Sequence, residues 1–182
     1  MRDVAARAQV SLGAVQRCFR NKEEMLLFAV DYVGERIIER VRDHLTRSAA
    51  QSAATALGHV TTEIALLRKA HRTEARIWLA FVAQAAVSEP LARSLRTSYA
   101  ALQDLLARLI TEAAESVPAD EGAAPPDPQR EARTLLALAD GLTSHVLIGH
   151  LTEEEAEEVL HAHMVSLWES LHTTRVRKAA RP

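Results

Sequence analysis

The sequence predicts an all-α protein, and three observations support this fold class. Helix-favouring residues dominate the 182-residue chain, above all Ala, Leu, Arg and Glu, whereas Gly and Pro occur only six times each. Apolar residues recur at the 3.6-residue period of a helix along several long segments. No segment shows the sustained apolar–polar alternation of a half-buried strand.

Two short helices open the predicted order, at residues 3–9 and 12–18, with a tight turn between them. Ser11 is suited to the N-cap of the second helix, because its hydroxyl can accept a hydrogen bond from a backbone N–H of the first turn. A long helix follows from Lys22, with an apolar stripe at Leu26, Val30, Val33, Ile37, Val41 and Leu45.

Five further helices are expected, at residues 51–68, 70–87, 89–116, 129–149 and 152–174. Pro90 fits the first turn of the third of these, and Thr152 with Glu155 forms a capping-box pattern at the start of the last. Four prolines and three acids make 117–128 the clear loop, and we expect it to link helices within one bundle.

The net charge of −2 predicts no general affinity for nucleic acid, but the charge is unevenly distributed. Residues 1–22 carry five basic side chains against Asp3 alone, and residues 153–158 contain five glutamates. A basic start on an acidic chain is typical of a small module that contacts phosphate, although a solvated helix face would give the same charges. The basic residues after 174 are interpreted as a frayed tail.

Several other classes of protein find little support. No apolar run reaches the roughly 18 residues of a membrane span, and the single cysteine, Cys18, suits the reducing cytoplasm. The sequence contains no phosphate-binding loop, dinucleotide fingerprint or nucleophile elbow, so an enzyme is not expected. No cofactor and no metal site are predicted, because His161 and His163 point to different faces of their helix. Cys18 is interpreted as a small filler rather than a thiol sensor.

The most informative segment is VAARAQVSLGAVQRCFRNKEEML, residues 4–26. Two short helices joined by a three- or four-residue turn form a helix-turn-helix, whose second helix enters the major groove of DNA by its N-terminal end. Small and apolar side chains can meet in a miniature core between the two helices, namely Ala5, Ala8, Val10, Val15 and Phe19.

This segment resembles the DNA-binding end of the TetR/AcrR family of transcriptional regulators, whose approximate pattern is IAxxAGVSxGxxYxxFxxKxxL. The matching residues are Val4, Ala5, Ala8, Val10, Ser11, Gly13, Phe19, Lys22, Met25 and Leu26. Gln9 replaces the family's turn glycine and Gln16 its usual aromatic residue. The family's first helix has no counterpart before Met1, and we expect a start codon assigned too late or a truncated chain.

The resemblance implies a homodimeric regulator, interpreted as a repressor, that binds a pseudo-palindromic operator in double-stranded DNA and releases it when an unknown small molecule binds. The rival hypothesis is a helical dimerisation or adaptor protein that has lost DNA binding. The implied organisation is an incomplete helix-turn-helix region with its connecting helix at 1–46, a ligand-binding and dimerisation bundle at 47–175, and a basic tail at 176–182. The residues expected to contact DNA are Arg2, Ser11, Gly13, Ala14, Gln16, Arg17, Arg20 and Lys22.

The family's middle helices enclose an effector pocket, which the resemblance implies here without fixing its residues. By position and type we expect its lining among Trp78, Phe81, Gln84, Tyr99, Gln103 and His145. Plain core packing is the stronger interpretation of Trp78 and Phe81. His145 is interpreted as a satisfied core or interface histidine rather than a ligand contact. The few polar groups nearby predict an apolar or amphipathic effector.

The helix at 129–149 is apolar on almost every side, which predicts partners beyond its own bundle. With the helix that follows, it is expected to form a four-helix seam between two copies of the chain, with packing inside one chain as the alternative. The residues expected at this interface are Leu135, Leu138, Leu142, Val146, Leu160, His163, Leu167 and Leu171.

Overall fold

The computed structural model describes residues 1–47, 52–116 and 127–176, except for the side chains of His44, Arg47 and residues 171–176. In these ranges the chain forms α-helices, one short 3-10 helix and no strand, which confirms the predicted all-α class. The elements are α1 (Arg2–Arg7), α2 (Leu12–Cys18), α3 (Lys22–Arg47), α4 (Ala53–Ile64), η1 (Lys69–His71), α5 (Arg72–Ala85), α6 (Glu89–Glu115), α7 (Pro128–Leu147) and α8 (Glu153–Val176).

The predicted helix at 51–68 is too long, because α4 ends at Ile64. Leu66 then adopts a left-handed conformation with φ of 50°, which turns Leu66 and Leu67 into the core. The hydroxyl of Thr143 on α7 donates a hydrogen bond to the carbonyl of Ala65 and so joins this turn to the neighbouring helix. The predicted helix at 70–87 likewise begins as the 3-10 turn η1. Most of the predicted loop, residues 117–126, lies outside the described residues.

Two capping predictions are confirmed. The backbone N–H of Glu155 donates to Thr152 Oγ1 at 3.1 Å, and that of Thr152 donates to the Glu155 carboxylate at 2.7 Å. This reciprocal pair closes the start of α8. The pKa of Glu155 is lowered, because its carboxylate accepts hydrogen bonds from the backbone and the side chain of Thr152, which favour the ionised form. Pro90 stands in the first turn of α6, where its missing N–H has no helical partner to lose.

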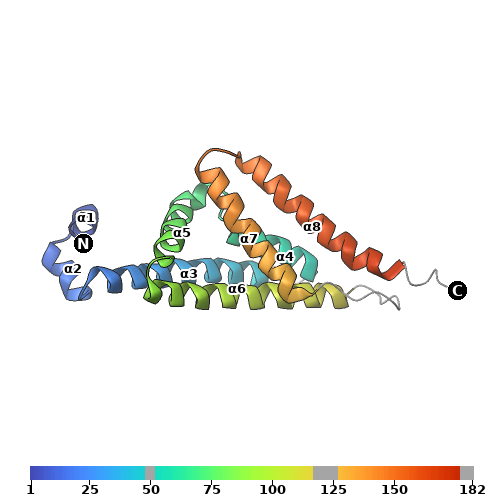
Figure 1. The fold of residues 1–182 in the computed structure, drawn as a ribbon, viewed down its shortest axis with the longest axis horizontal. Helices are drawn as coiled ribbons and strands as arrows, with labels where there is room; N and C mark the ends of the chain where they lie inside the picture. The colour runs from blue at the N-terminus through green and yellow to red at the C-terminus, as the bar shows by residue number, and fades with distance from the viewer. Residues whose placement is uncertain (48–51, 117–126, 177–182) are drawn as a thin grey trace.

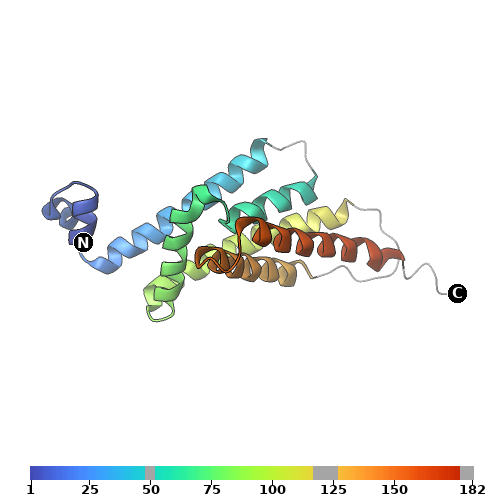
Figure 2. The same ribbon diagram turned by 90° about the horizontal axis from the view of Figure 1, so that it is seen from above.

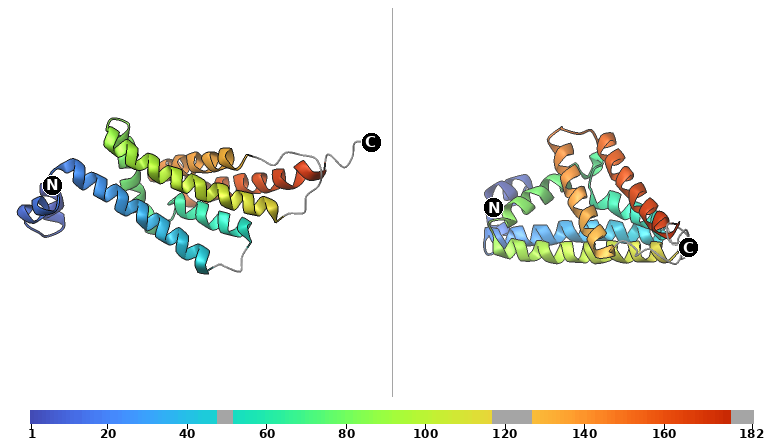
Figure 3. Two further views of the ribbon diagram at one scale, coloured as in Figure 1. Left: turned by 90° about the horizontal axis from the view of Figure 1, so that it is seen from below. Right: turned by 45° about the vertical axis from the view of Figure 1, so that its right-hand side comes forward.

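The helices are arranged around the long pair α3 and α6, which lie side by side (Figure 1). Helices α7 and α8 form a hairpin over this pair, and α5 crosses near one end (Figures 1 and 3). Seen from above, α8 lies between α4 and α7 (Figure 2). Helices α1 and α2 stand apart from the bundle, at the start of α3.

Three clusters of buried apolar side chains hold the bundle together. One lies where α3 meets α5 and α6, around Val30 and Trp78, and a second lies at the centre, around Leu106 and Leu135. The third joins α7 and α8 to the turn after α4. The apolar residues Val30, Val33, Ile37 and Val41 of α3 belong to this core, so the long helix is part of the bundle as well as the connection to α1 and α2. Among the described residues, no helix is both long and apolar enough to cross a bilayer.

Candidate functional sites

The turn between α1 and α2 has a geometry that normally requires glycine. The Val10 N–H donates to the Ala5 carbonyl at 3.0 Å and the Gln9 N–H to the Ala6 carbonyl at 3.3 Å, which is a Schellman-type helix end. Gln9 has a φ of 54°, in the left-handed region. The chain therefore makes the turn with a side chain that costs about 1 kcal/mol relative to glycine.

The second helix of the pair starts with an open, capped turn. The hydroxyl oxygen of Ser11 accepts a hydrogen bond from the Ala14 N–H at 3.1 Å, which confirms the predicted N-cap and leaves the hydroxyl proton available as a donor. Gly13, Gln16 and Arg17 are exposed, and Ala14 is half-buried. Small residues at the start of the helix and longer polar ones after it are compatible with close approach to base edges.

The cationic residues assigned to the DNA backbone are exposed at the same end of the molecule. Arg2 lies on α1, Arg20 lies between α2 and α3, and Lys22 begins α3. Figure 1 shows α1 and α2 beyond the bundle. Residues 1–22, which form this N-terminal module, carry a net charge of +4 by residue count. The structure thus brings the eight residues predicted to contact DNA onto one small module.

Sequence reasoning missed how α3 begins. The Glu24 N–H donates to Asn21 Oδ1 at 2.8 Å, and the Arg20 N–H donates to the Glu24 carboxylate at 2.6 Å. The spacing of Asn21 and Glu24 is a capping-box pattern that could have been found. The Glu24 N–H thus already has a side-chain acceptor, and the exposed Lys22 side chain is the expected contact for a phosphate at this helix end.

The predicted miniature core of the helix pair is only partly correct. Ala5 and Val15 are buried and Phe19 is half-buried, with its ring 5.4 Å from that of Phe28. Ala8 and Val10 are exposed instead, because no described element packs over their side of the pair. Two buried residues among the first 22 leave this module with little apolar stabilisation.

The six residues expected to line an effector pocket do not come together as one site. Trp78 and Phe81 are buried in the same cluster as the half-buried Tyr99, whose ring centroid lies 5.5 Å from that of Trp78. Gln103 bonds to Gln129 at the surface, Gln84 is exposed, and His145 is exposed beside His150.

Beside the aromatic group lies a half-buried carboxylate, that of Asp140, which sequence reasoning missed. Tyr99 donates a hydrogen bond of 2.5 Å to Asp140 on α7. Burial raises the pKa of Asp140 above its ordinary value, although its hydrogen bonds act in the opposite direction. Burial and the neighbouring carboxylate also raise the pKa of Tyr99. Nothing in the helical period around Asp140 distinguishes it from an exposed polar residue.

The residues expected at a dimer seam lie largely inside a single chain. Leu135, Leu142, Val146, Leu160 and Leu167 are buried, and Leu138 and His163 are half-buried. The side chain of Leu171 lies outside the described residues. Helix α7 is apolar on several sides because it packs against α4, α5, α6 and α8 of its own chain. The exposed positions of α7 and α8 are different ones, and they include Gly141 and His145.

An ion network around the buried Glu63 joins α3 to the helices that follow it. The Glu63 side chain is 4% exposed, and its carboxylate accepts from Arg40 Nε at 3.2 Å and from an Arg68 guanidinium nitrogen at 3.3 Å. Arg40 also pairs with Glu74 of α5 at 2.7 Å. Because breaking one arm of such a network leaves a charge without its counter-ion in low dielectric, these contacts fix α3 against α4 and α5.

Comparisons with known proteins agree on one family. The model of the BetI-type transcriptional repressor C-terminal domain matches residues 53–169, which is more than half of the chain. The HTH-type transcriptional regulator PksA of Bacillus subtilis is 26% identical over 168 residues, which cover 91% of this chain and 78% of PksA.

Solved structures lead to the same family. A transcriptional regulator from Rhodococcus sp. RHA1 superposes with a TM-score of 0.78 at 27% identity, over 92% of this chain and 84% of its own. A TetR-family regulator from Rhodococcus sp. gives a TM-score of 0.74 at 25% identity, over 91% and 85% of the two chains.

Proposed function

This chain belongs to the TetR family of transcriptional regulators, and we propose that it is a homodimeric repressor that releases its DNA operator when a small apolar or amphipathic molecule binds. Regulators of this family are not enzymes; they bind DNA operators and act as dimers. The observation that carries the proposal is the capped first turn of α2, which exposes Gly13, Gln16 and Arg17 on a basic module outside the bundle.

In this proposal α2 lies in the major groove, with its first turn against the bases. Ser11, Gln16 and Arg17 supply hydrogen-bonding groups for base edges, while Gly13 and Ala14 allow the backbone to approach. Arg2, Arg20 and Lys22 bind phosphates and fix the register of the helix on the duplex. Two copies related by a two-fold axis would place their α2 helices one turn of DNA apart, about 34 Å, on a pseudo-palindromic operator. A protein that acts on operators works in the cytoplasm.

The experiment is fluorescence anisotropy of the chain on duplex DNA taken from beside its own gene, at two salt concentrations and with an unrelated duplex for comparison. Selective binding that weakens with salt supports the proposal. Arg17→Ala is expected to lose about tenfold in affinity and part of its sequence preference. Lys22→Ala is expected to weaken binding to all duplexes alike and to reduce the salt slope by about one.

Arg108→Ala on α6 is the matched control, because Arg108 is exposed on the bundle and the substitution removes the same charge. If Arg108→Ala weakens binding as much as Arg17→Ala, net charge explains the effect and the assignment of α2 is wrong. If the unaltered chain binds no duplex selectively, the measurement is repeated with the codons upstream of Met1 restored. Recovered binding supports the repressor, whereas continued absence of binding replaces it with the adaptor hypothesis.

We also propose that the dimer face is the exposed outer side of α7 and α8. Ile148 is 77% exposed and Val159 is 44% exposed, although both are large apolar residues. Gly141, His145 and Ala162 are exposed on the same two helices. Because helices pack most closely through small residues flanked by apolar ones, this side suits a second copy better than the buried leucines do.

Gly141→Trp tests this face by sedimentation velocity. Gly141 is exposed and a Cβ built there meets nothing within 4 Å in its own chain, so the indole is expected to project outward, where it would block a neighbouring copy. The substitution is expected to shift the protein toward monomer, whereas Gly141→Ala should leave the dimer intact. An unchanged dimer in Gly141→Trp would place the interface elsewhere.

A further inference from the structure

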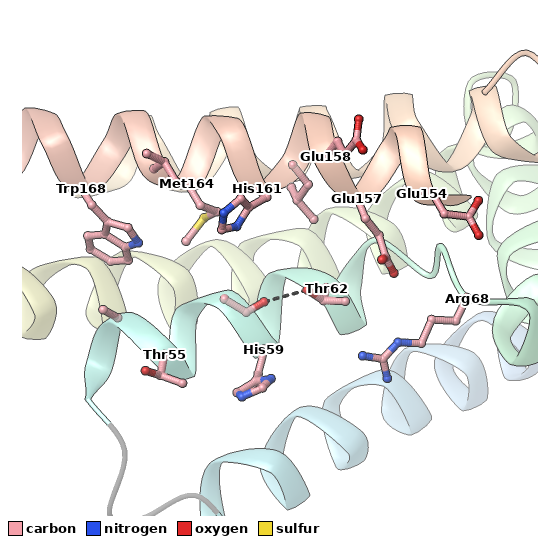
Figure 4. A pocket seen from close by; sticks show the side chains of 14 residues that line it. Thr55, His59, Thr62, Arg68, Glu154, Glu157, Glu158, His161, Met164 and Trp168 are labelled. Atoms are coloured by element: carbon pink, nitrogen blue, oxygen red, sulfur yellow. Dashed lines mark hydrogen bonds between the residues drawn. The ribbon is translucent and has the colours of Figure 1, made fainter. Parts of the chain in front are cut away.

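A groove of about 900 Å³ runs between α4 and α8, on the side of α8 that faces away from α7. Its volume is in the range of small-molecule pockets, about 300 to 1,000 Å³. Figure 4 shows side chains of α8 directed toward α4 along the groove, among them Trp168, Met164 and Glu157. None of the six residues expected to line an effector pocket borders this groove.

The two ends of the groove differ in chemistry. Trp168, Val165, Met164 and Leu160 give one part an apolar and aromatic surface. Glu154, Glu157 and Glu158 are among the residues that line the other end, together with Arg68. Figure 4 shows the Glu157 side chain directed toward α4 and the Glu158 carboxylate directed away from it. At 1.5 Å per residue, the distance along α8 from Glu157 to Trp168 is about 16 Å. The groove therefore has the length and the polarity of an amphipathic molecule.

The charge at the polar end favours a cation. Three glutamates line it against the single Arg68, which also forms an ion pair with Glu63. A cationic headgroup would be attracted by the glutamates, whereas an anionic one would be repelled by all three.

The α4 side of the groove is open because of a glycine. Gly58 lies among the lining residues, and a Cβ built at this position meets nothing within 4 Å. Glycine inside a helix costs about 1 kcal/mol relative to alanine, and no close packing at this position requires it. A larger side chain at Gly58 would project into free space and reduce the volume of the groove.

We propose that the groove between α4 and α8 binds an amphipathic molecule with its apolar part on Leu160, Met164 and Trp168 and a cationic headgroup near Glu154, Glu157 and Glu158. This inference rests on the proposed repressor function, because it names the effector site and the chemical class of the effector.

The polar end of the groove adjoins the ion network that fixes α3. Arg68 borders the groove and pairs with Glu63, which in turn accepts a hydrogen bond from Arg40 of α3. A cation bound beside the glutamates of α8 alters the field at Arg68 and at its pair with Glu63. Since α3 begins directly after α2, a change in how α3 is held moves the helix pair that contacts DNA.

The first test measures binding to the full chain without DNA. The probes are decylammonium, decanol and decanoate, which share one alkyl chain and differ in headgroup, each below its micelle-forming concentration. Isothermal titration calorimetry is expected to give the order decylammonium, decanol, decanoate from tightest to weakest. Decylammonium should also change the tryptophan fluorescence, and Trp168→Phe should remove most of that change.

Two variants separate the parts of the site. The triple variant is expected to bind decylammonium about tenfold more weakly and to bind decanol with unchanged affinity. It combines Glu154→Gln, Glu157→Gln and Glu158→Gln. Gly58→Leu should abolish binding of both, while its melting temperature stays at or above that of the unaltered chain. Glu112→Gln with Glu115→Gln on α6 controls for charge outside the groove and should have little effect on binding.

Three results would overturn the proposal: equal binding of the three probes, unchanged binding in Gly58→Leu, or a shift toward monomer in Gly58→Leu. The last result would make the groove a contact between copies of the chain.

The second test adds decylammonium to the DNA complex. The operator Kd is expected to rise for the unaltered chain and to stay constant for Gly58→Leu. Binding in the groove without an effect on DNA refutes the effector role of the site. A chain that binds no operator at all refutes the proposed function, whereas the calorimetry still decides whether the groove takes the cation.

Discussion

The N-terminal helix pair and the bundle behind it are stabilised by different means. The pair of α1 and α2 buries Ala5 and Val15 and depends on a cap at Ser11 and a strained turn at Gln9. The bundle buries three clusters of apolar side chains and an ion network around Glu63. Because apolar burial supplies most folding free energy, we expect the bundle to unfold cooperatively and the pair to open locally at much lower cost.

This difference is compatible with the proposed function, in which the DNA-contacting end changes position while the core persists. A local opening equilibrium lets a small change in α3 alter the helix pair without disturbing the bundle. The following substitutions test whether the two regions are independent, beginning with the largest expected effect.

Leu135→Ala should lower the free energy of unfolding of the bundle by about 2 to 5 kcal/mol, because it leaves a cavity beside fully buried neighbours. Urea denaturation followed by circular dichroism measures the change. Leu138→Ala on the same helix is the control and should cost less, since Leu138 is only half-buried. An equal loss in the two variants would contradict the assignment of Leu135 to the central core.

Val15→Ala should destabilise the helix pair by about 2 kcal/mol and leave the melting of the bundle almost unchanged. Hydrogen exchange should show faster exchange of amides in residues 2–18 alone, together with weaker operator binding. If amides of α6 and α7 lose protection to the same extent, the two regions unfold as one unit and the comparison fails.

Gln9→Gly should stabilise the turn between α1 and α2 by about 1 kcal/mol, since glycine adopts a φ of 54° without the steric cost of a side chain. Slower hydrogen exchange in α1 and α2 would measure the gain. Gln9→Ala keeps a Cβ and should not reproduce it. Faster exchange in Gln9→Gly would mean that the glutamine side chain stabilises the turn.

Asp140→Asn should have the smallest effect and a definite pH dependence. Burial raises the pKa of Asp140 in the folded chain, so its contribution to stability is present below its ordinary pKa and is lost as the pH rises through the raised value. Asparagine has an amide oxygen that can accept the hydrogen bond that Tyr99 donates to Asp140 in the unaltered chain. The unfolding free energy of Asp140→Asn should therefore increase relative to that of the unaltered chain as the pH rises from about 4. A difference that does not change with pH would show that Asp140 keeps an ordinary pKa.

The order and type of the helices could be predicted because each depends on local pattern. The 3.6-residue period located α3, α6, α7 and α8, and the capping residues Ser11 and Thr152 located two helix starts to within one residue. The helical period did not predict that α4 ends at Ile64. This end depends on the left-handed conformation of Leu66 and on a hydrogen bond from Thr143, which is far along the chain.

The sites were less predictable than the fold. The helix-turn-helix signature is local, so all eight candidate DNA contacts fall on one module. The assignment of effector and interface residues depends on which face of a helix meets which neighbour. A helix face in the core and one in an interface show the same apolar period, so the sequence does not distinguish them. Asp140, Glu63 and Gly58 carry no local signal at all, since their roles come from residues on other helices.

The sequence by itself determined the all-α class, the helix order and the helix-turn-helix, because propensity, period and capping act within one or two turns of the chain. Only the tertiary structure decided that the apolar residues of α7 pack against helices of the same chain. It also decided that Glu63 pairs with Arg40 and Arg68, and that α4 and α8 leave a groove between them. These features depend on which surfaces meet when helices far apart in sequence pack together, and that choice minimises exposed apolar area over the whole chain at once.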